Sequence, residues 1–118
     1  MKNARIKLGS LGEDIAAKYL QEQGYKILHR NFRSRYGEID IICGREQSVI
    51  FVEVKTRTNT SFGSPEESIT KTKQQHIHKV ALIYLETYPY SFQEIRFDVI
   101  GIIMDGSEPK LNHLEAAF

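Results

Sequence analysis

Two long apolar runs separated by a short polar turn occupy the middle of the chain, in GEIDIICGREQSVIFVEVKTR, residues 37–57. Runs of this kind, rich in Ile and Val, are typical of the two strands of a β-hairpin. Ionisable side chains interrupt both runs, at Asp40 in the first and at Glu53 and Lys55 in the second. Strands that are otherwise apolar belong in a core, so charges within them need partners.

The alternation of side chains assigns these charges to one face of the hairpin, because residues two apart on a strand point the same way. One face of the second strand is wholly apolar, whereas the other turns charged halfway along, at Glu53, Lys55 and Arg57. Asp40 belongs to the matching face of the first strand. The expected apolar face of that strand consists of Ile39, Ile41 and Cys43.

Pairing the strands brings the two acids together, since a four-residue turn at 45–48 sets Asp40 against Glu53. Directly opposed residues have Cβ atoms about 5 Å apart. Carboxylates that close repel each other, and one is expected to be protonated unless a cation lies between them. Lys55 supplies one positive charge, and a divalent ion held by oxygen ligands, Mg²⁺ or Mn²⁺, supplies two. The alternative is a surface ion pair at the end of a sheet, which contributes little to stability.

A helix is expected over residues 8–23, with Gly24 just beyond its end. Glu13 falls inside the apolar arc of this helix, which should face the sheet. A carboxylate there needs a partner, because burying it alone is costly. The alternative places Glu13 at the edge of the arc near the helix start, where the helix dipole favours an acid.

The rest of the chain completes a single domain over residues 1–118. We expect a first strand at 25–33, a polar loop at 58–69, a second helix at 70–86 and a last strand at 94–103. The segment from Ser64 to Glu67 also resembles a helix start, which leaves the start of the second helix open by one turn. The order α-β-β-β-α-β predicts an α/β fold with a small mixed sheet flanked by helices. The tail is expected to pack back through Leu111, Leu114 and Phe118.

Charge is unevenly distributed along the chain. Residues 1–79 hold 14 Lys and Arg against 9 Asp and Glu, whereas residues 80–118 hold 2 against 6. If several acids of the first part gather in one site, the remaining surface is basic and suits a polyanion such as nucleic acid. An ordinary solvated surface is the alternative. A single cysteine excludes an internal disulfide and indicates the cytoplasm, and no apolar run reaches the length of a membrane span.

Asp40, followed after 12 residues by E53-V-K55, resembles the PD-(D/E)XK nuclease signature without its Pro, since Ile39 precedes the Asp. More narrowly, an ordered set of motifs resembles the YraN-like family of predicted endonucleases, which is similar to archaeal Holliday-junction resolvases. The resemblance covers nearly the whole chain, through H113-L-E-A-A-F118. The motifs are G9-x-x-G-E-D14, Y36-G-E-I-D40, F51-V-E-V-K-T-R57 and F62-G-S-P65.

The resemblance implies a restriction-endonuclease-like αβββαβ core and Mg²⁺- or Mn²⁺-dependent cleavage of phosphodiester bonds. Asp40 and Glu53 match the metal carboxylates, Glu13 the additional acid of the resolvases and Lys55 the catalytic lysine. The backbone carbonyl of Val54 is expected to join the metal ligands. The resemblance favours DNA, including branched DNA, over RNA as the substrate. It also leaves open that the protein forms a homodimer, because resolvases cut paired strands. Expected contacts to nucleic acid are Arg30, Arg33, Arg35, Arg57, Lys71, Lys73 and Gln74.

Two other interpretations remain open from the sequence. The chain could bind nucleic acid on a nuclease-derived fold without turnover, or the charged cluster could be an ion network inside a structural domain. Among the isolated features, Cys43 is expected to pack in the core. Asp98, which interrupts the last strand, is expected to be solvated or salt-bridged.

Overall fold

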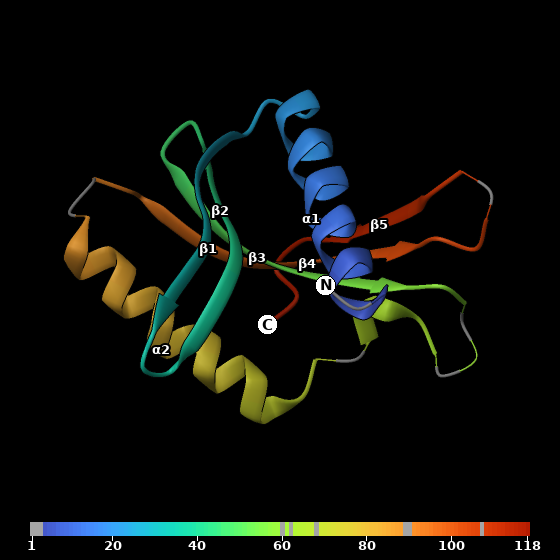
Figure 1. Ribbon diagram of the computed structural model, residues 1–118. Coiled ribbons are helices and arrows are strands. Elements are labelled where there is room, and N and C mark those ends of the chain that lie inside the picture. The colour runs from blue at the N-terminus through green and yellow to red at the C-terminus, as the bar shows by residue number, and fades with distance from the viewer. Residues whose placement is uncertain (1–3, 60, 62, 68, 89–90, 107) are drawn as a thin grey trace.

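Over the residues that the structure describes, the computed structural model is an open five-stranded sheet with one α-helix on each face (Figure 1). The described residues are 4–59, 61, 63–67, 69–88, 91–106 and 108–118, so Phe62 of the F62-G-S-P65 motif lies outside them. The elements are α1 (Ala4–Glu22), β1 (Lys26–Ser34), β2 (Gly37–Arg45), β3 (Ser48–Arg57), the 3₁₀ helix η1 (Pro65–Glu67), α2 (Lys71–Thr87), β4 (Glu94–Ile103) and β5 (Lys110–Leu114). This arrangement confirms the expected α/β fold with a mixed sheet flanked by helices.

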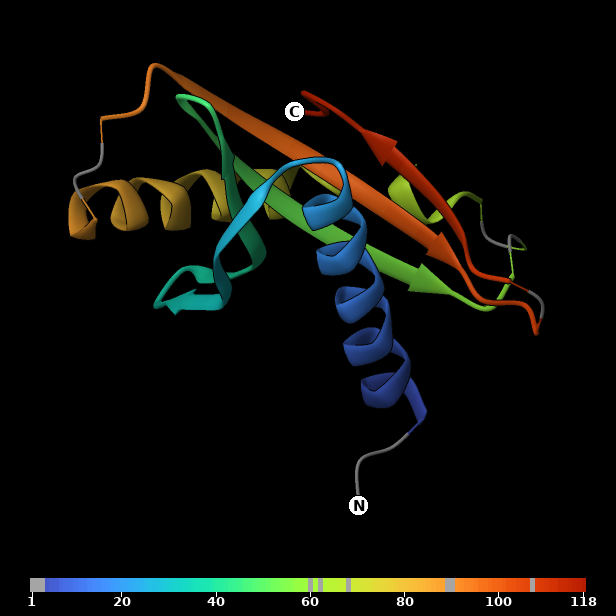
Figure 2. The same ribbon diagram turned by 90° about the horizontal axis from the view of Figure 1, so that it is seen from above.

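The strands lie side by side in chain order, from β1 to β5. β3 and β4 are parallel, whereas the other neighbouring strands are antiparallel. Because parallel strands need a long crossover, η1 and α2 lie between β3 and β4 in the chain. Figure 2 shows β3 and β4 running together with β5 beside them.

An apolar cluster joins each helix to the sheet. On one face, Ala16 and Leu20 of α1 pack with Ile50 and other residues of the sheet. On the other face, Tyr84 of α2 packs with Phe51. All five side chains are fully buried. Neighbouring residues 50 and 51 face opposite helices, as the period of two in a strand requires.

Two details of the hairpin differ from expectation. The pairing of Gly44 with Val49, which a turn at 45–48 implies, is confirmed, but the four-residue turn is wrong, because Arg45 pairs with Ser48 and the turn has two residues. The first of them, Glu46, has φ 57°, the left-handed conformation that such tight turns use. Ile39 does not share the expected apolar face of β2. It packs in the apolar cluster under α2, whereas Ile41 and Cys43 pack in the cluster under α1.

Several elements also differ from expectation in their bounds. α1 begins at Ala4, not at residue 8, and residues 65–67 form a separate 3₁₀ helix. Thr70 caps α2 by accepting a hydrogen bond from the Lys73 N–H at 3.1 Å, which fixes its start. The tail forms a fifth strand, which the expected order lacked. Leu111 and Phe118 pack on the two clusters as expected, whereas Leu114 is 38% exposed.

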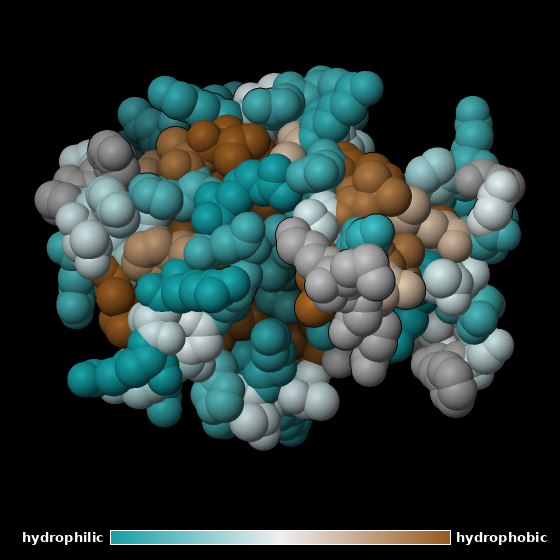
Figure 3. Space-filling model, in the orientation of Figure 1, coloured by the Kyte–Doolittle hydropathy of each residue, from teal (hydrophilic) through white to brown (hydrophobic). Residues whose placement is uncertain are grey.

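Exposed apolar side chains are spread over the surface. Hydrophilic side chains cover much of the face that Figure 3 shows, including the region over β1 and β2, and smaller apolar patches interrupt them. Among the described residues, no helix is both long and apolar enough to cross a membrane. Exposed large apolar residues come from four elements and are Ile6, Leu11, Leu82, Ile95 and Leu114.

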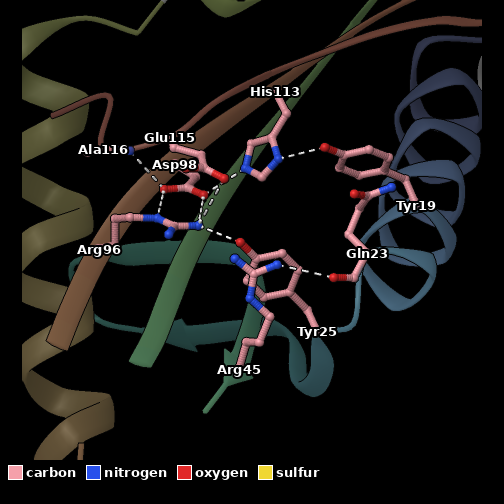
Figure 4. A network of polar contacts seen from close by, with 9 residues as sticks. All are labelled: Tyr19, Gln23, Tyr25, Arg45, Arg96, Asp98, His113, Glu115 and Ala116. Atoms are coloured by element: carbon pink, nitrogen blue, oxygen red, sulfur yellow. Dashed lines mark hydrogen bonds and ion pairs between the residues drawn. The ribbon is translucent and has the colours of Figure 1, made fainter. Parts of the chain in front are cut away.

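A buried polar network at the start of β4 fastens β5 and α1 to the sheet (Figure 4). Asp98 is fully buried and accepts two hydrogen bonds from Arg96, at 2.8 and 2.9 Å. His113 Nε2 lies 2.7 Å from the same carboxylate, and His113 Nδ1 lies 2.9 Å from the Tyr19 hydroxyl. The Ala116 N–H donates to Asp98 at 3.0 Å. Asp98 is therefore salt-bridged, as expected, and links the last two strands to α1.

We expect Asp98→Asn to lower the free energy of unfolding by about 2 kcal/mol at pH 7, because it leaves Arg96 with a neutral partner. Burial opposes ionisation of Asp98, but the hydrogen bonds from His113 and Arg96 hold its pKa below the usual range. The folded protein therefore binds this proton less readily than the unfolded chain, and wild-type stability should fall as the pH drops below about 4. Urea unfolding at pH 7 and pH 3 measures both effects. Equal loss in the variant and the wild type between these pH values would contradict the assignment.

Candidate functional site

The sheet divides where β2 leaves β3. The β2–β3 pairing ends at Ile41 and Val52, whereas β2 continues along β1 and β3 continues along β4. Figures 1 and 2 show the β1–β2 hairpin curving away from β3 and β4. The next residue on each strand is Asp40 on β2 and Glu53 on β3. Both acids therefore lie in the angle of this fork, as the predicted register required.

Asp40 joins the two sides of the fork through its side chain. Its Oδ2 atom accepts a hydrogen bond of 2.8 Å from the Val54 N–H of β3. The carboxylate thus satisfies a backbone donor just beyond the last residue pair of the β2–β3 ladder. This contact involves the Val54 amide, so the expected ligand role of the Val54 carbonyl stays a prediction.

Two further carboxylates approach Asp40, from α1 and β2. One oxygen from each of Glu13, Glu38 and Asp40 lies within 4.8 Å of the other two. Asn31 holds the first two together, since its Nδ2 donates to Glu13 Oε1 at 2.9 Å and to Glu38 Oε1 at 2.8 Å. Asn31 has φ 53°, a left-handed conformation that Asn tolerates better than most residues. With Glu53, these three side chains form the acid cluster: Glu13, Glu38, Asp40 and Glu53.

Glu53 is the most deeply buried member of the acid cluster, with 5% of its surface exposed. Its Oε2 atom is buried and has no hydrogen-bond partner among the described residues. Its Oε1 atom lies 3.8 Å from the Lys73 ammonium, at the start of α2. Burial raises the pKa of Glu53, although the charges of Lys73 and Lys55 oppose the rise. A buried carboxylate oxygen without a donor is costly, and a proton shared with Asp40 or a cation would lower that cost.

The pKa of Asp40 is strongly raised in this cluster. Burial, together with the nearby charges of Glu53, Glu13 and Glu38, raises the pKa of Asp40 to about 8, against the hydrogen bond from Val54. A carboxyl group in such a place stays protonated at neutral pH until a cation compensates the neighbouring charges.

The expected basic residues divide into two groups. Three of them contact the acid cluster: Arg33 pairs with Glu38 at 3.0 Å, Lys73 with Glu53, and Arg30 with Glu13 at 3.7 Å and more closely with Asp14. The others lie elsewhere or bond other groups. Arg35 donates to the Tyr36 hydroxyl, Gln74 donates to the Ile69 carbonyl, Lys71 is exposed, and Arg57 lies in the cleft described next.

A cleft of about 630 Å³ opens to solvent beside Glu13 of the acid cluster. The first half of α1 forms one wall and the end of β3 the other. Glu13 lies in it, with Lys55 and Arg57 from β3. The cleft therefore brings one carboxylate of the cluster close to the end of β3, the segment that carries Lys55 and Arg57.

The part of the chain that holds the acid cluster also matches a known protein family. Residues 12–102, more than half of the sequence, match the model described as Uncharacterised protein family UPF0102. The chain belongs to the UPF0102 family. It is 49% identical over 112 residues to a UPF0102 protein of Syntrophomonas wolfei, covering 95% of this chain and 97% of that relative. A UPF0102 protein of Caldanaerobacter subterraneus is 43% identical over 122 residues, covering the whole of both chains.

Two residues of this UPF0102 site were absent from the sequence-based set. Glu38 shares a strand face with Asp40, two positions earlier, so the period of two could have found it. Asn31 gave no such signal, because it lies in β1 and reaches Glu13 and Glu38 only through the β1–β2 pairing. Of the two placements that the sequence left open for Glu13, its contact with the cluster supports the one on the sheet side of the helix.

Proposed function

We propose that this UPF0102 protein is a metal-dependent endonuclease that hydrolyses phosphodiester bonds in nucleic acid, with DNA favoured over RNA. The main observation behind this proposal is that Asp40 and Glu53 lie close to two further carboxylates in the fork of the sheet, beside Lys55. The acids come from three elements, so local sequence alone does not explain their gathering. Ion pairs reach the other three acids of the cluster, whereas the pKa of Asp40 is raised to about 8.

The donor set fits a divalent cation. Glu53 Oε2 is buried without a partner among the described residues, and oxygen ligands of this kind suit Mg²⁺ or Mn²⁺. Asp40 and Glu53 would hold the ion with the Val54 carbonyl, and Glu13 would bind through water or help to hold a second ion. When bound, such an ion polarises a phosphate and lowers the pKa of a coordinated water molecule.

The chain's own side chains supply the rest of the chemistry. Lys55 would orient the attacking water and stabilise the negative charge that develops on the phosphate. The positive charge of Lys73, at the start of α2, partly offsets the negative charge of Glu53. Arg57 lies in the cleft with Lys55 and would contact the nucleic-acid backbone, which positions the substrate and makes affinity fall with salt.

The first test is cleavage of single-stranded, nicked and branched DNA with Mg²⁺ or Mn²⁺. Lys55→Met should reduce turnover about a hundredfold while leaving the affinity for Mn²⁺ unchanged, because Lys55 is assigned to the transition state. Glu53→Gln should weaken Mn²⁺ binding at least about tenfold in a calorimetric titration. Full activity in Lys55→Met, or unchanged Mn²⁺ affinity in Glu53→Gln, would remove the corresponding role.

The strongest rival is a nucleic-acid-binding protein without turnover. The described residues support it through the basic side chains around the acid cluster, and salt-sensitive DNA binding that needs neither metal nor Lys55 would favour it. If the acid cluster is instead an internal ion network, neutralising Asp40 should destabilise the fold.

A further inference from the structure

Glu66 in η1 lies directly against the backbone of β4. A Cβ atom built at Gly101 would lie 2.8 Å from Glu66 Oε2 and 3.0 Å from the Glu66 backbone nitrogen. Any side chain at position 101 would therefore displace the carboxylate, so glycine makes this close approach feasible. The Oε2 atom of Glu66 is buried and has no hydrogen-bond partner among the described residues.

Lys55 is the neighbour of Gly101 in the sheet. The two residues are paired in the parallel register of β3 and β4, and so are Phe51 and Phe97 four positions earlier. The rings of Phe51 and Phe97 stack at 5.3 Å, which shows that paired residues of these strands share a face. Four positions are two periods of a strand, so Lys55 points to the side on which Glu66 covers Gly101.

We propose that Glu66 is a positioning residue that holds the Lys55 ammonium beside Glu53. Within the described residues, the ion pairs under 4 Å include none of Lys55, although its charge acts on Glu53. The flexible stem of a lysine lets the ammonium reach a carboxylate on the adjacent strand. A buried carboxylate oxygen that lacks a donor supplies the complementary partner. The expected effect of Glu66 on turnover rests on the proposed nuclease function, whereas its contact with Lys55 does not.

A double-mutant cycle tests the contact without any activity. The wild type, Lys55→Met, Glu66→Gln and the double variant are unfolded in urea without metal. If the two side chains interact, Glu66→Gln should shift the midpoint in the Lys55→Met background by less than half of its shift in the wild type. Glu86→Gln, which removes an exposed charge on α2, is the matched control and should be additive with Lys55→Met. Additive shifts for Glu66→Gln would overturn the proposal.

Turnover provides the second readout. Glu66→Gln should lower kcat about tenfold, because a mispositioned Lys55 acts poorly in the transition state, and should leave KM and Mn²⁺ affinity within about twofold of the wild type. Unchanged kcat would reduce Glu66 to a structural side chain and overturn the positioning role. Absence of cleavage by the wild type would instead remove the nuclease proposal, and the cycle would still decide whether Glu66 holds Lys55.

Discussion

Asp40→Asn is expected to make the metal-free protein more stable at pH 8 and, at the same time, to abolish the proposed metal-dependent cleavage. Burial, together with the carboxylates around Asp40, raises its pKa to about 8, so the charged form is unfavourable in the fold. Asparagine cannot ionise, yet its side-chain oxygen can still accept the hydrogen bond from the Val54 N–H. The same change removes a proposed metal ligand, so we expect turnover to fall about a thousandfold.

The pH dependence of this effect has a definite sign. In the unfolded chain Asp40 ionises near its ordinary pKa of about 3.9. Between that value and about 8, the folded state therefore binds one proton more than the unfolded state at this site. Stability arising from this site is present at low pH and is lost as the pH rises from about 4 to 8. The variant lacks this loss, so its advantage should grow over that range to at least about 2 kcal/mol at pH 8.

Urea unfolding of both proteins at pH 5 and pH 8, without metal and with Mn²⁺, measures the prediction. Added Mn²⁺ should stabilise the wild type by about 3 kcal/mol at a concentration of about 100 times the dissociation constant and should leave the variant unchanged. Asp105→Asn, a change at an exposed acid paired with Lys110, is the matched control and should show neither effect. Lower stability of Asp40→Asn at pH 8 would favour an internal ion network over a metal site.

Local pattern was enough to predict that Asp40 and Glu53 meet in the candidate site. The alternation in β3 put Glu53 and Lys55 on one face, and the short hairpin put Asp40 opposite Glu53, because register follows from turn position and the period of two. The helical period likewise put Glu13 on the sheet side of α1. These are short-range rules, and each acted within one element or between adjacent strands.

Features that depend on tertiary contacts could not be predicted in this way. The 3₁₀ helix and β5 are short and polar, and they are fixed by what they pack against: Gly101 lies under Glu66, and His113 of β5 reaches Asp98. Ile39 left its expected face because β2 bends away from β3 just beyond Ile41. The site thus rests on long-range contacts that periodicity does not encode.

Gly12→Ala should destabilise the protein by about 3 kcal/mol, although alanine favours a helix more than glycine does. Gly12 is where α1 touches the sheet: a methyl group there would overlap the Thr56 hydroxyl and lie 3.0 Å from the Thr56 Cβ. The helix must move away from β3 to admit it, and Glu13, the next residue, would move away from Asp40 with it. We therefore expect a loss of turnover as well as of stability.

Gly9→Ala is the matched control for stability, since it lies one turn earlier in α1 and a Cβ atom there meets nothing within 4 Å. This variant should gain up to about 1 kcal/mol from helix propensity, which makes the two alanine variants differ by about 4 kcal/mol in urea unfolding. Adding Thr56→Ala to Gly12→Ala removes the overlapping hydroxyl and should restore part of the lost stability. Equal stability of the two single variants would show that α1 is not seated on β3 at Gly12, and the position assigned to Glu13 in the acid cluster would lose its structural basis.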